Sequence, residues 1–201
     1  KIPTHSDISF KNSSPALEWI SHSWLADIII YVSSSADIRI GTLLLIIPIL
    51  SSTLALLYLI QTNLKCSKFA IWTTLTIATL LLISFFRLHP LTFLIPLLLI
   101  LFWSYLNWRE NSKKHILIWP LVFLLWANIA GGFIFIPAFF CIAVLVAEIV
   151  RFLFLKDKFS PSFSDILGLI GAFLLGIILS FIYLNFIRIW FYVFSFAGVM
   201  E

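Results

Sequence analysis

Charged side chains are scarce in this chain, and their scarcity argues against a soluble globular protein. Only 11% of the 201 residues are Asp, Glu, Lys or Arg, whereas 62% are apolar. The mean hydropathy is +1.10. This balance leaves too few polar groups to cover the surface of a water-soluble fold. The composition therefore predicts a polytopic membrane protein.

Cysteine is rarer still, since the chain has only two. Cys66 lies in a predicted loop, and Cys141 lies within a hydrophobic run. The two cysteines therefore lie on opposite sides of a membrane boundary or inside the membrane, and this placement argues against a disulfide between them. The sequence also lacks the Cys and His spacing of a metal site. We predict no metal ligands, and the need for a divalent metal stays open.

What the chain has in abundance is long hydrophobic runs. A transmembrane helix needs about 20 mostly apolar residues to cross a hydrocarbon layer roughly 30 Å thick. Six runs approach that length, and no β pattern competes with them: residues 40–60, 69–86, 91–108, 116–130, 133–155 and 166–186. We predict an all-α transmembrane bundle of about six spanning helices within residues 38–201.

Basic residues mark alternate connections between these runs. The connections after the first, third and fifth runs hold Lys65, Lys68, Arg109, Lys113, Lys114, Lys156 and Lys158. The positive-inside rule places these connections in the cytoplasm. Residues 1–37, the connections after the second and fourth runs and the tail from residue 185 are then extracytoplasmic.

Residues 1–37 form the most polar part of the chain, and we predict that they belong to an extracytoplasmic loop. Ser14-Pro15 resembles a helix N-cap followed by a proline at the first helical position, so we expect a helix from there through Trp19 and Trp24 towards Val32. The indole rings favour the headgroup level of a membrane. This interfacial helix either rests on the bilayer with its charges in water, or forms one wall of a site.

The predicted outer side carries three arginines against the positive-inside bias, namely Arg39, Arg87 and Arg188. A guanidinium suits phosphate oxygens and is costly to hold near hydrocarbon without a partner. Each arginine either pairs with an acid such as Asp27 or a lipid headgroup, or binds an anionic ligand. Arg87 is the best candidate ligand residue, because its short connection, shared with His89, leaves it no room to swing away.

The fourth run is too short to reach the outer surface. Its fifteen residues span only roughly 22 Å at about 1.5 Å each. Asn128 and Gly131-Gly132 would then lie at depth, where irregular backbone is tolerated if it is buried in protein or lines a wet cavity. The alternative is that the glycines form a simple tight turn between two helices.

Four segments appear in an order that resembles one group of GT-C class membrane glycosyltransferases, which use polyprenyl-phosphate-linked sugars. The segments are residues 22–27, 87–92 and 126–133, and Asn185 followed by residues 188–190. The resemblance covers nearly the whole chain. It implies extracytoplasmic sugar transfer in a bacterial or archaeal plasma membrane, with a lipid-phosphate-linked sugar donor. The implied substrate-binding residues are His22, Asp27, Arg87, His89, Asn128 and Arg188, with Arg87 on the phosphate.

The chain departs from this family at several positions. Family members usually have an acidic residue in place of Ser23 and a histidine in place of Ala130. Their catalytic acid lies early in the first extracytoplasmic loop, a segment that would precede Lys1. We therefore expect an internal fragment of a longer protein, with Asp7 as the fallback candidate for the catalytic base.

Two other classes of membrane protein stay open. A transporter or lipid-handling subunit could use the same helices and an anion-binding recess, although transporters tend to have broken helices in two repeats and we find no convincing repeat here. A purely structural subunit would leave the outer arginines unexplained. In every case we expect membrane lipid as a partner and no nucleic acid, while the sugar, the acceptor and protein partners stay open.

Overall fold

The computed structural model describes residues 24–34, 38–85, 90–110, 113–130, 133–154 and 161–181. Every regular element in these ranges is helical, which confirms the predicted all-α class. The elements are α1 (Trp24–Ser34), α2 (Ile38–Asn63), α3 (Lys68–Phe85), η1 (Pro90–Phe93), α4 (Leu94–Glu110), η2 (Lys113–Leu117), α5 (Ile118–Ala130), α6 (Phe135–Phe154) and α7 (Phe163–Ser180), where η marks a short 3-10 helix.

Helices α2 to α7 overlap the six predicted runs one by one. Within the described ranges, three helical segments are long and apolar enough to cross a membrane: Arg39–Asn63, Phe135–Phe154 and Phe163–Ser180. This length and composition are compatible with a membrane protein. Helix α5 has only 13 residues, fewer than a perpendicular span needs. Six spans therefore stay a prediction.

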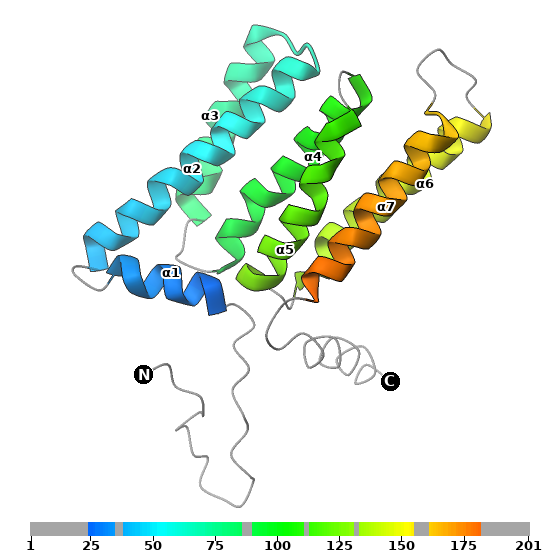
Figure 1. Cartoon of the computed structure of the whole chain (residues 1–201). Coiled ribbons are helices and arrows are strands. Elements are labelled where there is room, and N and C mark those ends of the chain that lie inside the picture. The colour runs from blue at the N-terminus through cyan, green and yellow to red at the C-terminus, as the bar shows by residue number, and fades with distance from the viewer. Residues whose placement is uncertain are drawn as a thin grey trace, which may run out of the picture.

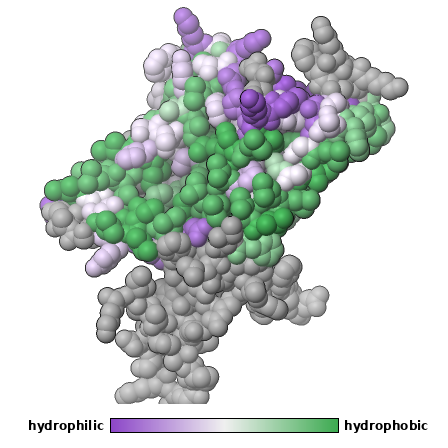
Figure 2. All heavy atoms as spheres, in the orientation of Figure 1, coloured by the Kyte–Doolittle hydropathy of each residue, from purple (hydrophilic) through white to green (hydrophobic). Residues whose placement is uncertain are grey.

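The six helices run alternately up and down (Figure 1). One end of the bundle holds the turn from α2 to α3 and the C-terminal end of α4 with η2. The C-terminal end of α6 and the N-terminal end of α7 lie at the same end. This end, the basic end below, holds six Lys and Arg residues of the described ranges: Lys65, Lys68, Arg109, Lys113, Lys114 and Arg151. Figure 2 shows hydrophilic residues gathered there above an apolar band. The sorting of basic connections to one end is thus confirmed for these residues.

Helix α1 lies across the opposite end, called the α1 end below (Figure 1). It packs on α2 and α5, and its Ala26 is fully buried, whereas Tyr31 is 74% exposed. Helix α1 matches the later part of the helix expected in residues 1–37. The expected start at Ser14-Pro15 lies outside the described residues.

Helix α5 is the central element of the bundle. It packs against α7, α4 and α1, and its side chains Trp119, Phe123 and Trp126 are almost completely buried. The close approach of α7 depends on Gly176, because a Cβ there would lie 3.0 Å from the Phe123 ring. Gly168, earlier on the same helix, has open space around it. Gly176 is therefore the small residue that allows this part of α7 to pack closely against α5.

Helix α3 lies at one edge and packs on α2. Its exposed side chains are largely apolar, with Phe69 82% exposed and Trp72 69% exposed. The hydroxyl groups of its threonines donate to carbonyl oxygens four residues earlier, as Thr73 does to Phe69 at 2.8 Å. Hydroxyl groups satisfied within their own helix suit an apolar surrounding, where no water is at hand.

Candidate functional site

Two of the predicted site residues lie within the described ranges, and both are at the α1 end. Asp27 is an exposed residue in the first turn of α1, where a carboxylate is favoured by the helix dipole. Asn128 is partly buried in the last turn of α5. Since α1 packs on α5, the structure brings together the two helices that carry them. The other predicted residues lie outside the described residues: Asp7, His22, Arg87, His89 and Arg188.

The side chain of Asn128 bonds to its own helix. Its Nδ2 donates to the carbonyl oxygen of Leu124 at 2.6 Å, which fixes the orientation of the amide. A hydrogen bond of 3.1 Å from the indole Nε1 of Trp126 to the carbonyl oxygen of Phe133 ties the end of α5 to the segment before α6. Ala130, the last residue of α5, is 4% exposed. The last turn of α5 is thus packed in protein on either side of Asn128.

Further element ends lie at the α1 end. Helix α3 ends at Phe85 and η1 begins at Pro90, while α7 ends at Ser180. The short helix η1 packs on α4 and α5. The described elements that flank the predicted motifs therefore end or begin at the same end of the bundle.

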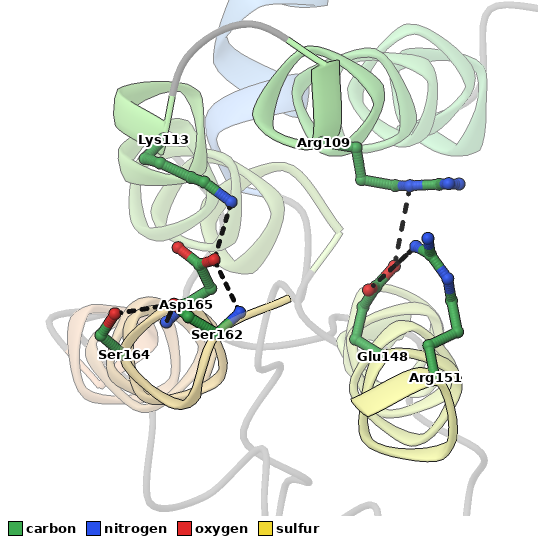
Figure 3. A network of polar contacts seen from close by, with 7 residues as sticks. All are labelled: Arg109, Lys113, Glu148, Arg151, Ser162, Ser164 and Asp165. Atoms are coloured by element: carbon green, nitrogen blue, oxygen red, sulfur yellow. Dashed lines mark hydrogen bonds and ion pairs between the residues drawn. The ribbon is translucent and has the colours of Figure 1, made fainter. Parts of the chain in front are cut away.

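A second polar group, which we call the Glu148 cluster, lies at the basic end and consists of Tyr105, Arg109, Glu148 and Arg151 (Figure 3 shows its charged members). Glu148 of α6 is 1% exposed. The Tyr105 hydroxyl of α4 donates to its Oε1, and Arg151 Nη1 lies 3.1 Å from each carboxylate oxygen. Arg109 Nε, also of α4, lies 3.9 Å from Oε1. The cluster therefore links α4 to α6.

Burial makes these contacts energetically important. A carboxylate removed from water costs several kcal/mol unless opposite charges and hydrogen bonds replace the solvent. Glu148 receives both, from Tyr105 and Arg151. The sequence showed that Arg151 follows Glu148 by one turn, but it gave no signal that Tyr105, 43 positions earlier, would reach the same carboxylate.

A separate ion pair ties η2 to the start of α7. Lys113 Nζ lies 3.0 Å from Asp165 Oδ2 and 4.5 Å from the centre of the Trp108 ring. Asp165 also accepts from the backbone N–H of Ser162, whose hydroxyl accepts from the Asp165 N–H. This reciprocal capping box fixes the first turn of α7. The pair serves a structural purpose at the helix start.

The described ranges contain no group of three or more His, Cys, Asp or Glu side chains that could hold a metal ion. No protein-family model matches the chain, and neither a curated protein nor a solved structure is significantly similar to it.

Proposed function

We propose that this chain is part of a six-span membrane glycosyltransferase that transfers a sugar from a polyprenyl-phosphate donor on the extracytoplasmic side. The four-segment resemblance to the GT-C class gives the reaction type. One structural observation supports the location of the site. Asp27 on α1 and Asn128 on α5 lie at the α1 end, together with the ends of the elements that flank the other motifs. The basic residues of the described ranges, Arg39 apart, lie at the opposite end.

The proposed reaction needs a base and a cationic group at the leaving phosphate. A carboxylate, expected upstream of Lys1, removes the proton from the acceptor hydroxyl, whose oxygen then bonds to the anomeric carbon of the sugar. The bond between that carbon and the phosphate oxygen breaks, and polyprenyl phosphate leaves with the electron pair. Arg87 stabilises the charge on this phosphate. Asp27 and Asn128 line the sugar pocket with His22 and His89, and Arg188 approaches from the far side.

The test uses the full-length protein in membranes, with polyprenyl-phosphate-linked sugars supplied one at a time and release of polyprenyl phosphate as the readout. We expect Arg87→Ala to lower the rate about 100-fold, because a charge-stabilising donor at the leaving group is lost. Arg39→Ala removes another arginine near the α1 end and serves as the matched control. Its rate should be near that of the parent protein. Full activity of Arg87→Ala would contradict the role of Arg87, and no turnover of any such donor would contradict the reaction.

A further inference from the structure

The buried carboxylate of Glu148 at the basic end has hydrogen-bond donors other than Arg109. Both oxygens of Glu148 already accept hydrogen bonds, from Tyr105 and from Arg151. Arg109 approaches only through Nε at 3.9 Å, a separation too long for a hydrogen bond. Its charge is held near the carboxylate, while the outer edge of its guanidinium is not used by Glu148. Figure 3 shows this edge directed away from Glu148.

Aromatic packing holds Arg109 in place. Its guanidinium carbon lies 5.9 Å from the centre of the Tyr105 ring. That ring is itself fixed by the hydrogen bond to Glu148 and by stacking on Trp108, with 6.1 Å between ring centres. The Arg109 side chain is nonetheless 40% exposed. A planar cation that is held in position at an accessible rim loses little conformational entropy when it binds an anion.

The surroundings combine excess positive charge with apolar surface. Within the part of the chain that the structure describes, the guanidinium groups of Arg109 and Arg151 both lie at the carboxylate of Glu148, so these three side chains together carry one net positive charge. On the helix that supplies Glu148 and Arg151, Phe154 follows Arg151 by three positions on the same helix face and is 76% exposed. Charge and apolar side chains side by side match a molecule with an anionic head and hydrocarbon chains.

We propose that Arg109 binds the phosphate of an anionic phospholipid. One phosphodiester charge neutralises the excess charge of the Glu148 cluster, and the guanidinium fork of Arg109 donates to two phosphate oxygens. The acyl chains then extend from the headgroup level along the apolar band of the bundle (Figure 2). The site is at the end of the bundle opposite the proposed sugar-transfer site, so the two proposals fail independently.

The experiment places the whole chain in nanodiscs that contain both phosphatidylcholine and phosphatidylglycerol, and identifies co-released lipid by native mass spectrometry. The wild-type chain should retain phosphatidylglycerol selectively. Arg109→Ala should lower this retention about tenfold, the effect of losing charge-assisted hydrogen bonds. Lys114→Ala removes the same charge from an exposed position at the same end and should change retention little. Arg109→Lys keeps the charge but loses the fork, and should retain an intermediate amount.

Three results would overturn the proposal. Wild-type protein without preference for phosphatidylglycerol would exclude a headgroup site. Equal losses in Arg109→Ala and Lys114→Ala would assign the binding to general surface charge. Displacement of the lipid by millimolar inorganic phosphate or glycerol phosphate would indicate a site for a soluble phosphate group. If Arg109→Ala fails to fold, the comparison of Arg109→Lys with wild type decides, because loss of the fork alone should reduce retention.

Discussion

Glu148 is a fully buried charged residue in a helix long and apolar enough to cross a membrane. Part of its environment can be read from the sequence, since a glutamate and an arginine three positions apart share one helix face. The remainder depends on how α4 packs beside α6, which pairwise spacing does not encode. Spacing along the sequence therefore indicates the i,i+3 pair of Glu148 and Arg151, but it does not indicate the contacts between α4 and α6.

Removing the buried carboxylate should be strongly destabilising. In Glu148→Ala, Arg109 and Arg151 would lie close together without a compensating charge, and the Tyr105 hydroxyl would lose its acceptor. We expect a loss of about 3–5 kcal/mol in the free energy of unfolding. Denaturant unfolding in detergent measures it, with Glu110→Ala, an exposed acid at the same end, as the control. A loss no larger than that of the control would show that the cluster does not stabilise the fold.

At the scale of the element, hydrophobic length predicted where helices lie, because a helix that buries or exposes apolar surface along its whole length needs a continuous apolar run. The boundaries were less accurate. Helix α7 begins at Phe163, three residues before the run, because Ser162 and Asp165 form a capping box. Helix α4 begins at Leu94, since the chain first forms the 3-10 helix η1 at Pro90. Polar capping residues and proline set these helix starts, and hydropathy alone does not predict their positions.

The α5–α7 contact gives an element-scale test with a control on the same helix. Gly176→Val places a branched side chain against Phe123, where even a Cβ would lie 3.0 Å from the ring. Overpacking of this kind costs typically about 1–3 kcal/mol. Gly168→Val makes the same change where nothing lies within 4 Å, and should leave stability nearly unchanged. Thermal unfolding of the two variants in one detergent compares them, and equal melting temperatures would contradict the packing role of Gly176.

For the whole molecule, charge sorting along the sequence predicted the alternation of ends, because each basic connection follows an odd-numbered run. The sequence did not predict that α5 would be central, nor that α1 would lie across the bundle on α2 and α5. Those features depend on which side chains fit together, such as Ala26 against its neighbours and Gly176 against Phe123. The candidate site was likewise predicted as a set of segments, of which the described residues bring Asp27 and Asn128 to one end.

The orientation of the bundle decides whether sugar transfer can occur outside the cell, and a native cysteine can report it. Cys66 is partly exposed in the turn at the basic end, whereas Cys141 is fully buried and should stay unlabelled. A membrane-impermeant maleimide should therefore label Cys66 only after intact cells are permeabilised. Tyr31→Cys in a Cys66→Ser background places a thiol at an exposed position of the α1 end, and it should be labelled in intact cells.

The opposite pattern would put Asp27 and Asn128 on the cytoplasmic side. A donor site at the α1 end would then face the wrong compartment, and the proposed reaction would have to be abandoned even if Arg87 binds phosphate.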